Sequence, residues 1–170
     1  MLSIREEEPG DINALTRVHQ AAFGRSDEGE LVARLRENDQ LSISLVATVG
    51  EHPVGHIAFS PVQPAIAGIQ APPLALGPVG IDPEHERRGI ASRLVQAGLE
   101  KAEALGTPYV VVLGDPTFYG RLGFEPINKH ELQGDYPADE AFRILVLSKG
   151  KLPPAGSHIQ YVPAFEGLPT

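Results

Sequence analysis

The stretch from residue 74 to residue 113 constrains the fold most, because its pattern alternates strand, helix and strand. Leu74 to Ile81 is predicted to be a buried strand, and Arg88 to Ala104 an amphipathic helix. Tyr109 to Leu113 is continuously apolar, as in a strand covered on both faces. This order favours a right-handed crossover between two parallel strands. The chain is therefore predicted to have an α/β fold.

Gly77 and Pro78 interrupt the first of these strands. Proline has no backbone N–H to give to a neighbouring strand, so it belongs at a bulge, at an edge or where two strands splay apart. We therefore predict a local break in strand pairing at this point.

The loop Ile81 to Ser92, between the strand and the helix, is typical of an anion-binding turn. The first turn of a helix leaves backbone N–H groups without partners, and the helix dipole adds partial positive charge there. Phosphate binds well at such a place, and Gly89 and Ala91 would let it approach the main chain. Arg87 and Arg88 add positive charge. An ordinary helix start with two solvated arginines would have the same sequence. However, positive side chains at a helix N-terminus are unfavourable unless an anion compensates them.

Composition excludes several classes of function. The chain has 170 residues, 42% of them hydrophobic, which suits one domain. A net charge of −8 argues against binding to nucleic acid or to an anionic membrane. The absence of cysteine excludes disulfides, thiolate metal sites and a cysteine nucleophile. The N-terminus turns acidic too early for a signal peptide, and prolines rule out a membrane helix in Ala65 to Ile81, so a cytoplasmic location is predicted.

The remaining elements follow from periodicity and turn residues. The predicted helices are one beginning after Asp11, Glu30 to Glu37 and Thr117 to Leu122, and the predicted strands are Ser3 to Glu7, Ser42 to Val49, Val54 to Ser60, Phe124 to Ile127 and Phe142 to Leu147. The predicted loops are 24–29, 61–73 and 128–141, and the tail from Lys149 is too apolar to be simply disordered.

Three segments resemble the GNAT superfamily of acyl-CoA-dependent N-acyltransferases: Val79 to Pro83, Arg88 to Ala91 and Tyr119 to Phe124. That superfamily has a Q/R-x-x-G-x-G/A loop, which aligns with Glu86 to Ala91, and a Tyr-x-x-x-Gly-Phe segment after the next strand. Other segments resemble a little-characterised bacterial branch, and they are Val54 to Ile57, Leu76 to Pro78, Leu113 to Tyr119 and Tyr161 to Phe165. The resemblance covers most of the chain.

The resemblance implies one domain, residues 1–170, with a mixed, partly splayed sheet flanked by helices. Its core would span about residues 1–148, and a C-terminal extension, 149–170, would pack on that core. Acetyl-CoA would be the cosubstrate, without a metal. The expected contacts are the pantetheine arm and thioester carbonyl with the backbone of Val79, Gly80 and Ile81, and the pyrophosphate with Arg87, Arg88, Gly89, Ile90, Ala91 and Ser92. Asp115 and Phe118 would line the far side of the arm, and Arg121 would reach the adenosine phosphate.

Glu86 departs from the superfamily, which commonly has Gln or Arg at that position. Because a carboxylate near a pyrophosphate is repelled, we expect Glu86 to point away from the phosphates. Weaker cofactor binding is expected if it does not.

Tyr119 is the predicted general acid, since a positioned phenol can protonate a departing thiolate. The alternative is a core tyrosine that packs a short helix. Without cysteine, direct attack by the amine in a ternary complex is the simplest route. The general base is left open: a lone histidine on a strand, such as His56, is more often structural, and His85, Glu84, water or an already neutral amine are further alternatives.

The sequence thus predicts an N-acetyltransferase that moves an acetyl group from acetyl-CoA to a primary amine on a small molecule or peptide. Glu28 and Glu30 either line the acceptor site or are solvated surface carboxylates. An acyl-CoA-binding or sensing module without turnover is the alternative function. A nucleotide-binding domain is disfavoured because no Gly-Lys-Ser/Thr loop or G-x-G-x-x-G motif is present. The acceptor and the oligomeric state, a homodimer included, are not determined by the sequence.

Overall fold

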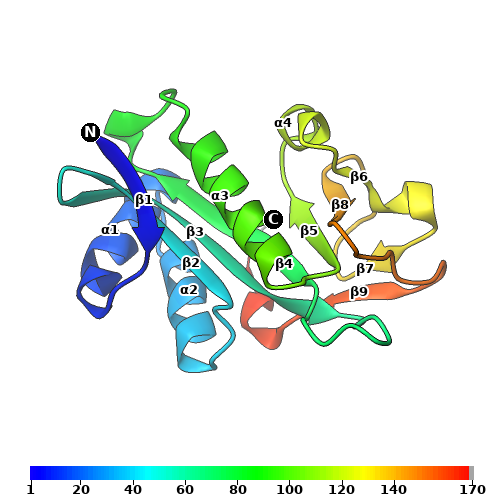
Figure 1. The fold of residues 1–170 in the computed structure, drawn as a ribbon. Helices are drawn as coiled ribbons and strands as arrows, with labels where there is room; N and C mark the ends of the chain where they lie inside the picture. Colours follow the sequence, from blue (N-terminus) through cyan, green and yellow to red (C-terminus); the bar gives the residue numbers. More distant parts are fainter. Residues whose placement is uncertain (169–170) are drawn as a thin grey trace. The chain divides into compact units, whose positions relative to one another are not determined.

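The structure is a computed structural model, and it describes residues 1–168 (Figure 1). The last two residues of the expected extension 149–170 therefore lie outside the described residues. The chain forms two compact units. Of the described residues, unit 1 comprises Met1–Ser60, Pro78–Lys101 and 163–168, and unit 2 comprises Pro61–Gly77 and Ala102–Val162. Among residues 1–168, no helix has both the length and the apolar character needed to span a bilayer.

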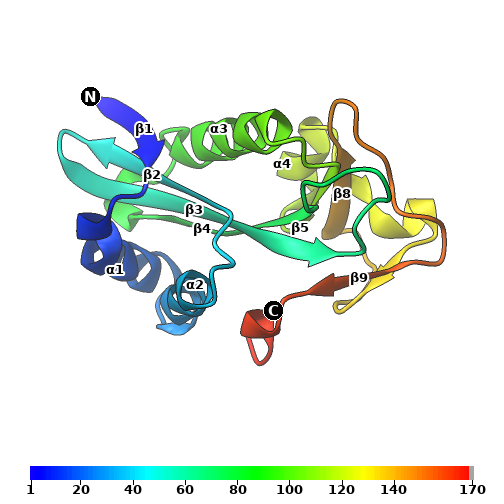
Figure 2. The ribbon, with the colours of Figure 1, turned by 60° about the horizontal axis from the view of Figure 1, so that its bottom comes forward.

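Unit 1 is a layer of strands between helices. Its strands are β1 (Leu2–Glu6), β2 (Ile43–Val49), most of β3 (His52–Gln63) and the end of β4 (Leu74–Ile81), and its α-helices are α1 (Ile12–Phe23), α2 (Asp27–Glu37) and most of α3 (Ile90–Ala104). Short 3-10 helices are η1 (Pro9–Asp11), η2 (Pro83–His85) and η4 (Pro163–Phe165). β2 pairs antiparallel with both β1 and β3. α1 and α2 cover one face of these strands, and α3 covers the other (Figures 1 and 2).

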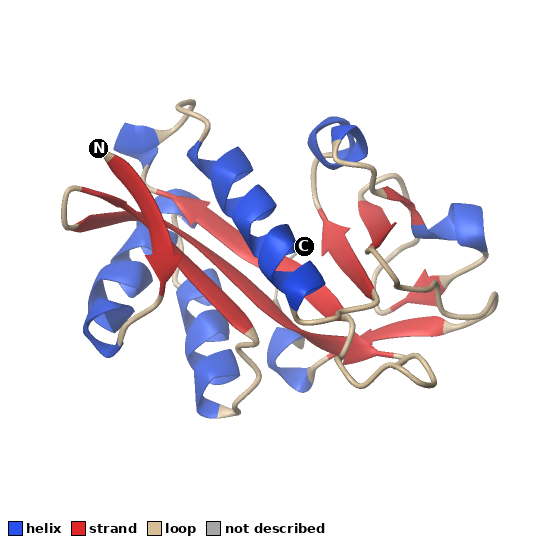
Figure 3. Ribbon diagram, in the orientation of Figure 1, coloured by secondary structure: helices blue, strands red, loops and turns tan. Residues whose placement is uncertain are grey.

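Unit 2 contains the start of β4 beside β5 (Tyr109–Leu113). These strands are parallel, from Leu74 opposite Val110 to Leu76 opposite Val112. On its other side β5 pairs antiparallel with β8 (Phe142–Val146). The remaining elements are α4 (Pro116–Arg121), β6 (Glu125–Pro126), η3 (Ile127–His130), β7 (Gln133–Gly134) and β9 (His158–Tyr161), drawn in Figure 3. β9 pairs with the last residues of β3 and with β7.

The predicted strand, helix and strand are confirmed, and so is the parallel pair. The β4–β5 register ends at Leu76, whereas β4 itself continues to Ile81. Gly77, with φ 137°, occupies backbone space that other residues rarely adopt. The predicted break at Gly77 and Pro78 is therefore present, and the fold is a mixed, splayed sheet flanked by helices.

Several predicted boundaries were wrong. α2 begins at Asp27, although residues 24–29 were predicted to be a loop, because acidic residues are favourable in the first turn of a helix. β3 runs to Gln63 and β7 lies within 128–141, where loops were predicted. Both depend on β9, whose partners are distant in sequence, so local patterns do not reveal them.

Two helical glycines should respond in opposite ways to alanine. A Cβ at Gly98 of α3 would lie 2.4 Å from the Phe59 ring, whereas one at Gly29 of α2 would meet nothing closer than 3.6 Å. We expect Gly98→Ala to lower the free energy of unfolding by about 1–3 kcal/mol through overpacking. Gly29→Ala should raise it by up to about 1 kcal/mol, because alanine favours a helix. Urea denaturation measures both, and stabilisation by Gly98→Ala would contradict the packing described.

Candidate active site

The turn before α3 has an unusual backbone and is exposed. Arg87 and Gly89 are in the left-handed region, with φ 62° and 76°, and residues 86–89 are exposed. Among the described residues, the backbone N–H groups of residues 87–92 have no hydrogen-bond partner. Such a turn at the positive end of a helix suits a phosphate group.

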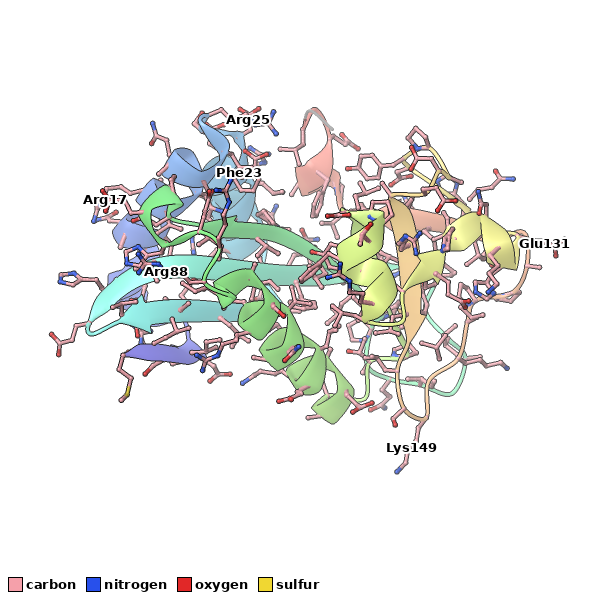
Figure 4. The ribbon with its side chains drawn as sticks, turned by 90° about the horizontal axis from the view of Figure 1, so that it is seen from above. Arg17, Phe23, Arg25, Arg88, Glu131 and Lys149 are labelled. Atoms are coloured by element: carbon pink, nitrogen blue, oxygen red, sulfur yellow. The ribbon has the colours of Figure 1, made fainter. Side chains whose placement is uncertain are left out.

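The same turn sets the start of the helix. Because the backbone before Ile90 is not helical, α3 begins two residues later than the predicted Arg88. Asp82 stabilises the approach to the turn, since its Oδ1 accepts a hydrogen bond from the Glu84 N–H at 3.0 Å. Arg88, labelled in Figure 4, is exposed. The sequence-predicted residues Arg87 to Ser92 thus lie together in the turn and the first residues of α3, where residues 87–89 are exposed and Ile90 is buried.

The end of β4 contacts a helix on each face. Ile81 packs toward α3, because a Cβ at the neighbouring Gly55 would lie 2.9 Å from Ile81 Cδ1 and 3.2 Å from Leu94. Gly80 faces the other way, as alternation along a strand requires. A Cβ there would lie 2.7 Å from His19 Nδ1 on α1. The predicted pantetheine segment, Val79 to Ile81, therefore has a histidine ring against its central residue.

That histidine begins a buried chain of polar side chains within unit 1. His19 Nε2 and His56 Nδ1 are 2.8 Å apart, and His56 Nε2 is 2.7 Å from Ser44 Oγ. Ser44 donates to Glu7 Oε1 at 2.8 Å, and Arg36 holds both oxygens of Glu7 at 2.8 and 3.0 Å. His19 and His56 are 1% and 0% exposed. Phe23, labelled in Figure 4, stacks on the His19 ring.

Burial keeps both imidazoles neutral. It lowers the pKa of His19 to about 4, a shift that the Glu28 carboxylate opposes and the Arg36 guanidinium favours. The pKa of His56 is also lowered well below its ordinary value, first by burial and then by His19 and Arg36. Both rings can therefore act as hydrogen-bond acceptors at neutral pH.

The other predicted site residues lie in unit 2, around α4. Asp115 caps this helix by accepting a hydrogen bond from the Thr117 N–H at 2.9 Å. Tyr119 is 9% exposed, and its ring packs edge-on against Phe118 and Phe124. Gly114 allows this packing, since a Cβ there would lie 2.3 Å from the Tyr119 ring.

Burial, with a smaller contribution from Asp115, raises the pKa of the Tyr119 phenol to about 12. The phenol therefore keeps its proton at neutral pH. Phe118 is half-buried, and Arg121 is exposed at the end of α4.

The structure thus gathers the predicted residues into two groups, one in each unit. Among the alternatives for a general base, His56 is buried and His85 half-buried. His19 was missed, although it falls on the apolar face of α1 between Val18 and Ala22, where a polar side chain is a signal. The interpretation of Glu28 as a solvated carboxylate was wrong: it is 4% exposed and pairs with Arg25, which is labelled in Figure 4.

Comparison with known proteins identifies the class. Residues 3–127 match the model of the acetyltransferase (GNAT) domain. The chain is 34% identical over 160 residues to the uncharacterized N-acetyltransferase YhbS of Escherichia coli (strain K12), covering 93% of this chain and 95% of the relative. It is 37% identical over 120 residues to the uncharacterized N-acetyltransferase YjhQ of the same organism, covering 68% of this chain and 65% of the relative.

Two solved structures are similar over almost the whole chain. The Escherichia coli YhbS structure in complex with CoA has a TM-score of 0.88 and 32% identity, covering 99% of this chain and 93% of that one. A GNAT family acetyltransferase from Brucella melitensis in complex with acetyl-CoA has a TM-score of 0.79 and 32% identity, covering 98% and 99%. The chain belongs to the GNAT acetyltransferase family, and it is accordingly an acyltransferase.

The buried histidines should make unit 1 sensitive to acid. Between about pH 7 and pH 4 the unfolded chain binds protons at His19 and His56 that the folded chain excludes, so stability must fall as pH falls. His19 alone should cost about 2 kcal/mol near pH 5. Urea denaturation at several pH values measures this loss. His19→Gln should reduce it, whereas His52→Gln, at the exposed start of β3, should not; equal pH dependence in both variants would contradict the assignment.

Proposed function

We propose that this chain transfers the acetyl group of acetyl-CoA directly to a primary amine within a ternary complex. The family supports an N-acetyltransferase, and solved relatives in complex with CoA and acetyl-CoA support the cosubstrate. The observation that carries the proposal is the exposed turn before α3, where unpartnered N–H groups meet the positive end of a helix.

Each predicted residue then has a role. Backbone groups of Val79, Gly80 and Ile81 bind the pantetheine arm and orient the thioester carbonyl. The turn and first helical residues, Arg87, Arg88, Gly89, Ile90, Ala91 and Ser92, bind the pyrophosphate. Asp115 and Phe118 contact the arm, and Arg121 contacts the adenosine phosphate. Glu86 points away from the phosphates.

Tyr119 is the proposed general acid. Its phenol is neutral at pH 7, so it is a hydrogen-bond donor to sulfur as the carbon–sulfur bond breaks. A pKa near 12 makes the free phenol a weak acid, so proton transfer requires contact with the developing thiolate.

The acceptor is a small-molecule or peptide amine. The domain would be residues 1–170 with a core near 1–148, and it would act in the cytoplasm. A homodimer is compatible with this proposal, although the sequence does not determine the oligomeric state. An acyl-CoA sensing module without turnover remains the alternative. Acetyl-CoA would stabilise either protein against heat, whereas only the enzyme releases a thiol when an amine is added.

A thiol-release screen over polyamines, amino acids, aminoglycosides and N-terminal peptides tests turnover. Tyr119→Phe keeps the ring contacts and should lower kcat by about 10²-fold or more with the chosen amine. Its acetyl-CoA affinity should not change. Tyr136→Phe, in another aromatic cluster, is the control. Full turnover by Tyr119→Phe would remove the phenol from the mechanism.

Gly89→Ala tests the phosphate turn. Alanine at φ 76° is strained by about 1–2 kcal/mol, so the turn should open and acetyl-CoA affinity should fall by about tenfold. Gly50→Ala is a matched control, because Gly50 has φ 62° and open space around it in the turn between β2 and β3. Calorimetric titration with acetyl-CoA compares them, and equal affinities would contradict a role for the turn.

A further inference from the structure

His19 has no role in the acetyl transfer proposed from the sequence motifs. Its Nδ1 is buried and lacks a hydrogen-bond partner among the described residues. Buried polar atoms normally have partners, so an orphan calls for an explanation. This one lies against Gly80, the central residue of the segment proposed to orient the thioester. Any side chain at position 80 would displace the imidazole.

The hydrogen bonds fix which nitrogen carries the proton. The Glu7 carboxylate, held by Arg36, only accepts, so the Ser44 hydroxyl must donate to it. Ser44 Oγ must then accept from His56 Nε2–H, so His56 Nδ1 carries no proton in the neutral ring. His56 Nδ1 accordingly accepts from His19 Nε2–H. This series of hydrogen bonds therefore leaves the lone pair of His19 Nδ1 free, and that nitrogen lies next to Gly80.

We propose that His19 Nδ1 is the proton acceptor in acetyl transfer and that His56, Ser44 and Glu7 are positioning residues that keep its lone pair free. This inference rests on the proposed acetyl transfer to an amine and deepens it. The acceptor amine would meet the thioester beside Gly80. Because His19 Nδ1 is buried against Gly80, ligand binding must open this contact before the amine N–H, or one bridging water, reaches that nitrogen.

The proton balance is simple. As the nitrogen–carbon bond forms, the amine nitrogen becomes acidic and its proton moves to His19 Nδ1. As the carbon–sulfur bond breaks, the sulfur takes the proton of Tyr119. His19 then releases its proton to solvent, and Tyr119 regains one. The imidazolium formed in between donates from Nε2 to His56, and the Glu7 carboxylate at the far end of the chain stabilises the charge.

A cluster of histidines and carboxylates, such as His19, His56 and Glu7, can also indicate a metal site. Within residues 1–168, no group of three or more such side chains is arranged to hold an ion. A purely structural histidine is the remaining alternative. It differs in one testable respect, because a structural role needs only the hydrogen bond, whereas a proton acceptor needs a basic nitrogen.

Glutamine separates these roles, because its amide has a donor and an acceptor spaced much like the two imidazole nitrogens, but no basic atom. We expect His19→Gln to lower kcat by about 10²-fold or more, with unchanged KM for acetyl-CoA. His56→Gln can still accept from His19 and donate to Ser44, so its kcat should fall by less than about tenfold. His56→Leu cannot do so and should lose more. His52→Gln is the control.

The probe is the amine that gives the fastest thiol release from wild-type protein. If no amine releases thiol, the proposed function fails and this inference fails with it. If wild type is active and His19→Gln retains its kcat, only the inference is overturned. Charged groups near His19 and His56 also affect the pH dependence of kcat/KM, so this profile does not report the two histidines alone. These groups are Glu28, Arg36, Asp11 and Glu7.

A second measurement does not require turnover. Nitrogen NMR of wild-type protein labelled with 15N-histidine reports the tautomer of each ring, and at pH 7 we expect both buried rings to be neutral with the proton on Nε2. His56→Gln and His52→Gln assist assignment by removing signals. A proton on His19 Nδ1 at neutral pH would overturn the proposal.

Discussion

The early end of the β4–β5 ladder is the constraint on which the rest of the structure depends. Pairing stops after Leu76, while β4 continues through Gly77 and Pro78 to Ile81. Backbone polar groups seldom remain without partners, and Pro78 contributes no N–H of its own. In the proposed function, the part of β4 beyond this register would bind the pantetheine arm, which is an extended ligand with amide groups. The same strand leads directly to the turn before α3, so in that proposal one run of backbone would bind both the arm and the pyrophosphate.

Local chemistry explains which parts of the fold were predictable. Two features could be predicted from a few neighbouring residues. The apolar run Tyr109 to Leu113 predicts a buried strand, and the glycine and proline in β4 predict a break in pairing. The structure agrees with both. β9 could not be predicted, because its partner Val62 lies almost a hundred residues earlier and β7 contributes only two residues. The start of α2 differs from the prediction for another reason: a polar stretch is typical of a loop, but here its acidic residues form the first turn of a helix.

The candidate site divides in the same way. Residues 87–92 and Tyr119 are found in contiguous motifs, so the resemblance could locate them. His19 could not be found so, because its meaning depends on His56, which is 37 residues away, and on a glycine in a third element. The sequence left the general base open and included His56 only as one alternative, whereas the hydrogen bonds leave the free lone pair on His19. A contiguous motif can therefore suggest a binding loop, whereas a relay of side chains that are distant in sequence is visible only in the structure.

The two proposed proton-transfer groups share one physical origin. Burial is the first cause of both pKa shifts, lowering that of His19 to about 4 and raising that of Tyr119 to about 12. Desolvation disfavours whichever form is charged, so at neutral pH it leaves the imidazole unprotonated and the phenol protonated. The same shifts make His19 a weak base and Tyr119 a weak acid, so each would exchange a proton only in contact with the reacting group. For His19, the proposed role of the polar chain from His56 to Glu7 is therefore twofold: it leaves one nitrogen free, and it places a carboxylate where it stabilises the imidazolium.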